Sequence, residues 1–119
     1  MPKLMGIDVG STTVKVTVLA EDLQILYTSY ERHFARVKEC VLNQLSIVEQ
    51  KFGAQPFCVS ITGSAGLGLA ERSKISFVQE VQAAFTAIRK YYPDADAAVE
   101  LGGEDAKIIF ITGGTEQRM

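Results

Sequence analysis

The hydrophobic period of the sequence changes near residue 35, and this change constrains the possible folds more than any other feature. Before it, three short segments rich in β-branched residues predict β-strands over residues 4–9, 13–19 and 24–31. After it, apolar residues recur every three to four positions over residues 35–52, which predicts an amphipathic helix. Because short turns connect the three strands, we expect an antiparallel meander that leads into this helix.

The second half of the chain alternates between strand and helix patterns. An apolar run predicts a buried strand over residues 57–62, and apolar spacing predicts a second long helix over residues 78–92. The pieces between and after them are shorter, and we expect one helical turn at 69–72, a short strand at 75–77, and hairpin strands at 97–101 and 106–112.

The resulting order is βββαβ(α)(β)α followed by a β-hairpin. This order is typical of a ribonuclease-H-like α/β domain, in which a mixed five-stranded sheet carries helices on both faces. Its central strands are parallel where helices cross over. We therefore predict a first domain over residues 1–94, and we interpret residues 95–119 as the opening hairpin of a truncated second domain.

Composition excludes several classes of protein. The 119 residues are 47% hydrophobic and 22% charged, which is ordinary for a globular domain with a core. The net charge of −2 argues against a nucleic-acid surface, which usually carries a basic stripe. There is no apolar run of about 18 residues and no secretory signal pattern, so we expect a cytoplasmic protein without a membrane span.

The turn between the first two predicted strands has the composition of a phosphate-binding turn. Gly10 allows the chain to reverse where a Cβ would obstruct it, and Ser11, Thr12 and Thr13 offer hydroxyl and backbone N–H groups to an anion. Lys15 follows and could reach the same anion. Asp8 would repel phosphate, so its plausible role is to hold Mg²⁺ through water. The alternative is a plain hairpin turn with a capping Asp.

A second turn near the end of the sequence has the same form. Glu100 ends a predicted strand, two glycines and two carboxylates follow, and Lys107 lies on the next strand. The candidate residues of this second turn are Gly102, Gly103, Glu104, Asp105 and Lys107. A tight two-glycine hairpin is the alternative, but two similar turns together favour two halves that face one phosphate chain.

Other conspicuous residues have plainer interpretations. The glycines at 63–68 match neither the dinucleotide fingerprint nor the P-loop, and we interpret them as a mobile loop. Cys40 and Cys58 show no ligand spacing, so we expect reduced, mostly buried thiols. His33 is the only histidine, which argues against a histidine-based metal site. Glu80 opens the second long helix as an N-terminal helix charge.

The segment from Gly6 to Thr13 resembles the first phosphate motif of the superfamily of acetate kinases, sugar kinases, heat-shock chaperones and actin. Together with Thr62-Gly63-Ser64, the helix start near Gln79-Glu80-Val81 and the segment from Glu100 to Lys107, it resembles one branch of that superfamily. This branch contains the ATP-dependent activators of 2-hydroxyacyl-CoA dehydratases and benzoyl-CoA reductases. The resemblance covers nearly the whole chain, and its specific parts are the two glycine turns.

The resemblance implies an actin-like ATPase fold and a homodimer that binds ATP and Mg²⁺ between two ribonuclease-H-like domains. A [4Fe-4S] cluster bridges the subunits in that family, and ATP hydrolysis drives one electron at low potential to the dehydratase or reductase. It implies that the turn from Gly10 to Thr13 holds phosphates, that Asp8 places Mg²⁺ or the attacking water, and that Gly102, Gly103 and Asp105 form the second phosphate turn.

The sequence departs from the family pattern in three respects. Glu100 stands where the family usually has Asp, and Glu104 stands where it usually has Gln. The family's cluster cysteines lie in a glycine-rich segment beyond the second turn, and Cys40 and Cys58 do not match them. We therefore expect the cluster in the parent protein only.

Two alternatives stay open from the sequence. A ribonuclease-H-like nuclease also places an Asp on its first strand, and it would need further carboxylates near Asp8, for which Glu80, Glu100 and Asp105 are candidates. A non-catalytic interaction domain could keep the fold without turnover. In either case, we expect the C-terminal hairpin to expose edges that could pair with the first domain or with another copy of the chain.

Overall fold

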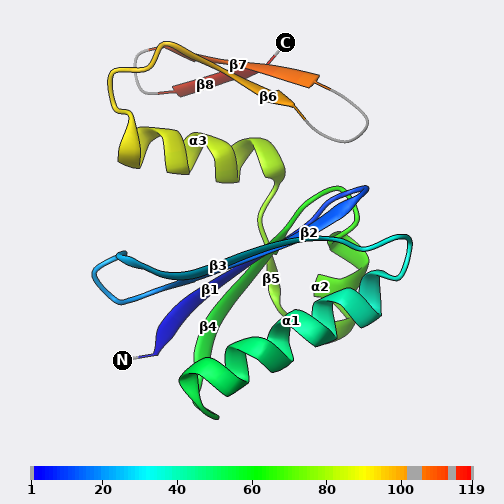
Figure 1. Cartoon of the computed structure of the whole chain (residues 1–119). Coiled ribbons are helices and arrows are strands. Elements are labelled where there is room, and N and C mark those ends of the chain that lie inside the picture. The colour runs from blue at the N-terminus through cyan, green and yellow to red at the C-terminus, as the bar shows by residue number, and fades with distance from the viewer. Residues whose placement is uncertain (1, 102–105, 113–114, 119) are drawn as a thin grey trace. The chain divides into compact units, whose positions relative to one another are not determined.

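The computed structural model describes residues 2–101, 106–112 and 115–118, and the chain divides into two compact units, Met1–Phe77 and Val78–Met119. The elements of the first unit are β1 (Lys3–Val9), β2 (Thr13–Leu19), β3 (Ile25–Arg32), α1 (Val37–Phe52), β4 (Phe57–Thr62), α2 (Leu67–Ser73) and β5 (Ser76–Phe77). Figure 1 shows their arrangement. The first element of the second unit is α3 (Glu80–Tyr91).

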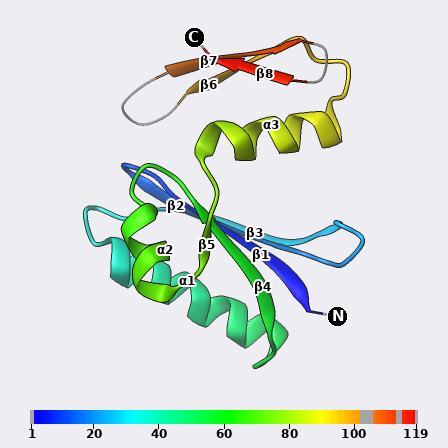
Figure 2. The same cartoon turned by 180° about the vertical axis from the view of Figure 1, so that it is seen from behind.

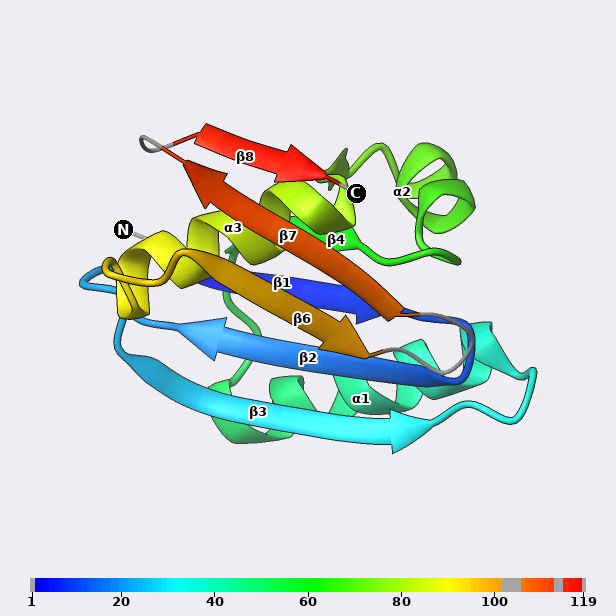
Figure 3. The same cartoon turned by 90° about the horizontal axis from the view of Figure 1, so that it is seen from above.

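A mixed five-stranded sheet in the order β3-β2-β1-β4-β5 forms the first unit, as predicted. The first three strands are antiparallel neighbours, and β4 runs parallel to β1 and to β5. Figure 3 shows β3, β2 and β1 side by side in this order. The meander and the crossover through α1 are therefore confirmed.

The core of the first unit lies on one face of this sheet. Alternate residues of β1 and β2 are buried there because successive strand residues point to opposite faces. They pack against Val41 and Val48 of α1 and against Ala70 of α2. Figure 2 shows that both helices cover the same face. The buried strand residues are Met5, Ile7, Val9, Val14, Val16, Val18 and Ile61.

The prediction of a wholly buried β4 is wrong. Phe57, Val59 and Ile61 face the helices, whereas Cys58 and Ser60 are exposed on the other face. Burial alternates because the helices of the first unit cover only one face of its sheet. Cys58 is accordingly an exposed thiol, and the expectation that both cysteines are mostly buried fails at this position.

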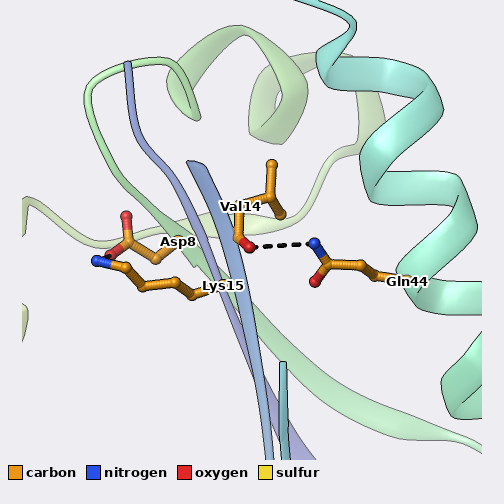
Figure 4. Close-up of polar contacts among 4 residues, drawn as sticks. All are labelled: Asp8, Val14, Lys15 and Gln44. Atoms are coloured by element: carbon orange, nitrogen blue, oxygen red, sulfur yellow. Dashed lines mark hydrogen bonds and ion pairs between the residues drawn. The ribbon is translucent and has the colours of Figure 1, made fainter. Parts of the chain in front are cut away.

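A polar side chain inside the core ties α1 to the strands. Gln44 of α1 has no exposed surface, and its Nε2 donates to the Val14 carbonyl oxygen at 3.0 Å. Its Oε1 accepts from the Ser29 hydroxyl at 2.6 Å. Figure 4 shows Gln44 reaching the strand from the helix side, with Asp8 and Lys15 on the opposite side. Since a buried amide needs partners, these bonds fix α1 against β2 and β3.

The second unit contains α3 (Glu80–Tyr91) and a three-stranded antiparallel sheet in the order β6-β7-β8. Its strands are β6 (Ala97–Leu101), β7 (Ala106–Thr112) and β8 (Thr115–Arg118). The first two match the predicted hairpin, and β8 was not predicted. α3 groups with these strands, so the compact units divide after Phe77, whereas the sequence placed the boundary after residue 94.

Helices α1, α2 and α3 differ in length from their predictions, and α3 spans Glu80–Tyr91 where residues 78–92 were expected. α1 begins at Val37 because Phe34 and Ala35 have left-handed backbone angles, with φ of 49° and 63°. α2 has seven residues where one helical turn was expected. None of the helices in the described ranges is long and apolar enough to cross a membrane.

Candidate functional site

One edge of the five-stranded sheet brings together the turn that the sequence singled out and two further loops. β1 and β4 are parallel, so their carboxyl ends meet at this edge. The Ala65 N–H donates to the Val9 carbonyl oxygen at 2.9 Å, and the His33 N–H donates to the Thr12 carbonyl oxygen at 3.0 Å. The loop after β4 and the loop after β3 therefore both contact the first turn.

Asp8 and Lys15 face each other beside the first turn. They are direct cross-strand partners, and Lys15 Nζ lies 3.7 Å from Asp8 Oδ2. Their side chains are 40% and 47% exposed, so both remain accessible to a ligand. Lys15 Nζ also lies 5.4 Å from the centre of the Tyr30 ring. Figure 4 shows the pair on the face opposite Gln44.

The first turn keeps backbone donors available. The Gly10 N–H donates to the Thr13 carbonyl oxygen at 2.9 Å. Within the described part of the chain, the N–H groups of Ser11 and Thr12 have no hydrogen-bond acceptor. Neighbouring N–H groups without a protein acceptor can bind an anion. The predicted phosphate turn thus has the required donors, with Lys15 as the adjacent cation.

The predicted reason for Gly10 is wrong. Its backbone is not left-handed, and an added Cβ would meet Thr13 O at 3.5 Å, which is ordinary van der Waals contact. The chain can therefore reverse at this position with another residue. A Cβ at position 10 would lie in ordinary contact with the backbone and side chain of Thr13.

The glycine loop after β4 is packed against the site, whereas the sequence suggested a mobile loop. Gly63 has a φ of +104°, and a Cβ there would overlap the Val9 carbonyl group and lie 2.6 Å from Asp8 Oδ1. A Cβ at Gly66 would lie 2.9 Å from the Ile61 side chain. The Asp8 carboxylate therefore lies between the backbone of Gly63 and the ammonium of Lys15.

His33 forms the third part of the site, and the sequence did not reveal this role. The side chain is 7% exposed, and its Nε2 lies 3.0 Å from the Gly10 carbonyl oxygen. Its Nδ1 accepts the Ala35 N–H at 3.0 Å. The only available signal was its position just after a strand that ends beside the turn.

The polar atoms near Asp8 fit a hydrated Mg²⁺. Thr62 is the parallel register partner of Asp8, and its Oγ1 is buried with no hydrogen-bond partner in the described structure. A buried hydroxyl without a partner is costly, by about 1–3 kcal/mol. Mg²⁺ takes oxygen ligands and often keeps several waters beside one or two carboxylates. No group of three or more potential metal-binding side chains exists among the described residues.

Arg32 is a second cation near the turn that the sequence analysis did not include. It is the cross-strand partner of Thr13, two pairs beyond the pairing of Lys15 with Tyr30. Its guanidinium carbon lies 4.9 Å from the centre of the exposed Phe34 ring. Thr13, Lys15 and Arg32 lie on the same face of the sheet, so two cations, Lys15 and Arg32, lie with Asp8 beside the turn.

The second predicted turn lies outside the described residues. Gly102, Gly103, Glu104 and Asp105 fall there, so their predicted roles stay untested. The strands on either side are in register, with Glu100 opposite Lys107 and Leu101 opposite Ala106. The backbone pairing agrees with a hairpin at this place.

The cysteines do not form a cluster site. Cys40 lies on α1 and packs against the core, where Gln44 Nε2 approaches its Sγ at 3.5 Å. Cys58 lies on the uncovered face of the sheet. The two thiols point to different faces, so they do not fit a shared iron–sulfur cluster.

Comparisons with known proteins identify the fold. No protein-family model matches the chain. An uncharacterized protein of Methanocaldococcus jannaschii is 31% identical over 113 residues, which are 91% of this chain and 43% of that protein. This chain therefore spans less than half the length of that relative.

Two solved structures have the same fold. Component A of the Acidaminococcus fermentans (R)-2-hydroxyglutaryl-CoA dehydratase superposes with a TM-score of 0.81 at 21% identity, over 97% of this chain and 45% of that one. The activator of the Clostridium difficile 2-hydroxyisocaproyl-CoA dehydratase, solved with bound ADPNP, gives 0.74 at 20% identity, over 98% and 45%. The chain therefore has the ribonuclease-H-like fold of actin-like ATPases.

Proposed function

We propose that this chain is the N-terminal part of an ATP-binding, ATP-hydrolysing activator. In this proposal, the turn from Gly10 to Thr13 binds phosphate oxygens through its N–H groups, and Lys15 supplies positive charge. The observation that carries the proposal is that the N–H groups of Ser11 and Thr12, beside the Asp8–Lys15 pair, have no acceptor among the described residues. Similarity to a dehydratase activator solved with ADPNP supports it at the level of the fold.

Asp8 is the proposed catalytic residue of this half of the site. Its partly exposed carboxylate would hold the waters of a bound Mg²⁺, with the unpartnered Thr62 hydroxyl beside it. When bound, Mg²⁺ supplies neutralisation of the charge that develops on the phosphates. Asp8 can also orient an attacking water, because Lys15 at 3.7 Å and Gly63 fix the carboxylate.

The proposed site has a second half in the turn between β6 and β7. Gly102, Gly103 and Glu104 would contact phosphates from that turn, Lys107 would offset its carboxylates, and Asp105 would be its catalytic carboxylate. Support comes from the sequence pattern and from the pairing of Glu100 with Lys107.

The proposed parent protein is a homodimer with a bridging [4Fe-4S] cluster and a cytoplasmic location. Its partner would be a 2-hydroxyacyl-CoA dehydratase or a benzoyl-CoA reductase. ATP hydrolysis would drive low-potential electron transfer to that enzyme. The cysteines of this chain do not fit the ligand set of such a cluster.

Substitution of Asp8 in the full-length protein tests the proposal. We expect Asp8→Ala to abolish ATP hydrolysis while the circular dichroism spectrum and unfolding midpoint stay close to the wild type, because Asp8 is partly exposed. Glu39→Ala is the control, since Glu39 is exposed and, within the described ranges, its carboxylate pairs with Arg36 alone. Normal turnover by Asp8→Ala would refute the central role of this carboxylate. Mg²⁺-dependent cleavage of a nucleic-acid hybrid by the wild type would favour the nuclease alternative.

A further inference from the structure

We infer that His33 is a positioning residue for the phosphate turn, because it sets the direction of the turn's N–H groups. The inference rests on the proposed binding of phosphate at this turn. His33 is the first residue after β3 and lies next to the turn between β1 and β2. Its backbone and its ring both contact the turn, at Thr12 and at Gly10.

The hydrogen bonds of the ring select one tautomer. Nδ1 accepts the Ala35 N–H at 3.0 Å, so this nitrogen carries no proton. The neutral ring then has its proton on Nε2, which donates to the Gly10 carbonyl oxygen at 3.0 Å. Because the side chain is 7% exposed, water competes little for either bond. The ring therefore holds the Gly10 carbonyl on the His33 side of the turn.

Peptide geometry transmits this constraint to the donors of the turn. In a trans peptide, the C=O and N–H groups point in opposite directions, and no peptide bond in the described structure is cis. Holding the Gly10 carbonyl toward His33 directs the Ser11 N–H away from it. Holding the Thr12 carbonyl by the His33 N–H directs the Thr13 N–H away in the same manner.

His33 also replaces a bond that would otherwise close the turn. A two-residue hairpin normally pairs its flanking residues through two bonds, one in each direction. Here the Gly10 N–H donates to Thr13 O, but no bond from the Thr13 N–H to Gly10 O occurs in the described structure. The carbonyl bonds to His33 Nε2 instead. One of the two closing hydrogen bonds of the turn is therefore missing among the described residues, which leaves the Thr13 N–H available to an anion.

The backbone after His33 turns back on itself, so that it hydrogen-bonds to the imidazole ring. Phe34 and Ala35 have φ angles of 49° and 63°, a conformation that non-glycine residues rarely adopt. This bend returns the Ala35 N–H to Nδ1, and the Arg36 N–H donates to the His33 carbonyl oxygen at 2.8 Å. The orientation of the ring is thus fixed from its own loop before any ligand binds.

Two substitutions separate positioning from simple stability. The side-chain amide of Gln can donate from the place of Nε2, whereas Asn reaches only the place of Nδ1. In the full-length protein, we expect His33→Asn to raise the Kd and the KM for Mg-ATP about tenfold with a smaller change in kcat. We expect His33→Gln to stay within about threefold of the wild type. Both variants should lower the unfolding midpoint similarly, since both remove the ring.

Two controls make the outcome decisive. ¹⁵N chemical shifts of the wild-type ring should show the Nε2–H tautomer without nucleotide, and an Nδ1–H tautomer would overturn the inference. Equal loss of Mg-ATP affinity in both variants would indicate a structural role only, and full affinity in His33→Asn would also overturn it. If the wild type itself fails to bind Mg-ATP, the proposed function fails, which is a separate result.

Discussion

Gly10 and Gly63 stand at the same edge of the sheet, but the structure requires glycine at only one of them. The sequence directs attention to Gly10, which opens the turn of serine and threonine residues. A Cβ there would meet its nearest atom at 3.5 Å. Gly63 lies in a stretch that resembles a plain loop, yet its φ is +104° and a Cβ would overlap the Val9 carbonyl group. Glycine at position 10 leaves space for a ligand, whereas glycine at position 63 permits the fold.

The two turns are also held in different ways. The first turn is held by His33, a side chain far from it in the sequence. The loop after β4 is held by steric fit and by the bond from the Ala65 N–H to Val9 O. A glycine's conformational freedom can be read from the sequence, but the atoms that surround it cannot.

The largest effect should come from Gly63→Ala. Left-handed strain and overlap with Val9 and Asp8 should together lower the free energy of unfolding by roughly 2–4 kcal/mol. Gly53→Ala is a matched control, because Gly53 also has a positive φ, +78°, but no atom within 4 Å of its added Cβ. Urea unfolding measures both. Equal losses in the two variants would mean that contact with the Asp8 site adds nothing.

In contrast to Gly63→Ala, Gly10→Ala should weaken the binding of Mg-ATP without destabilising the fold. Its stability should be unchanged or higher by up to about 1 kcal/mol, because Ala restricts the unfolded chain. Its Kd for Mg-ATP should rise about tenfold, because the methyl group occupies space beside the turn N–H groups. Calorimetric titration and thermal unfolding of the full-length protein test the two parts. A strongly destabilised Gly10→Ala would remove the contrast with Gly63.

The sequence predicted most of the first unit because its signals are local. Short apolar and β-branched segments located β1, β2, β3 and β4, apolar residues at every third or fourth position located α1, and the βαβ order predicted which strands are parallel. Candidate site residues could be named from the sequence only where the type of side chain indicates its chemistry, as at Asp8 and Lys15. The role of His33 depends on hydrogen bonds to carbonyl groups in another segment, and no residue pattern records these bonds.

β8 was missed, and the sequence did not indicate that α3 groups with β6, β7 and β8, for a related reason. Thr115–Arg118 carries no apolar alternation, and its strand conformation comes from pairing with β7. α3 has a clear helical pattern, but periodicity does not say which compact unit a helix joins. Tertiary context decides both features.

The smallest change in stability should come from Lys15→Gln. The Asp8–Lys15 pair is 40–47% exposed, so solvent screens it and its loss should cost less than about 1 kcal/mol. Arg36→Gln is a matched control, because the Arg36–Glu39 pair has a similar separation of 3.6 Å but is more exposed. The two variants should have nearly the same free energy of unfolding in urea. The KM for Mg-ATP should rise several-fold in Lys15→Gln and stay unchanged in Arg36→Gln, since Lys15, unlike Arg36, lies beside Asp8 on the strand that follows the turn. Equal KM values in both variants would mean that the Lys15 charge serves Asp8 and not the phosphate.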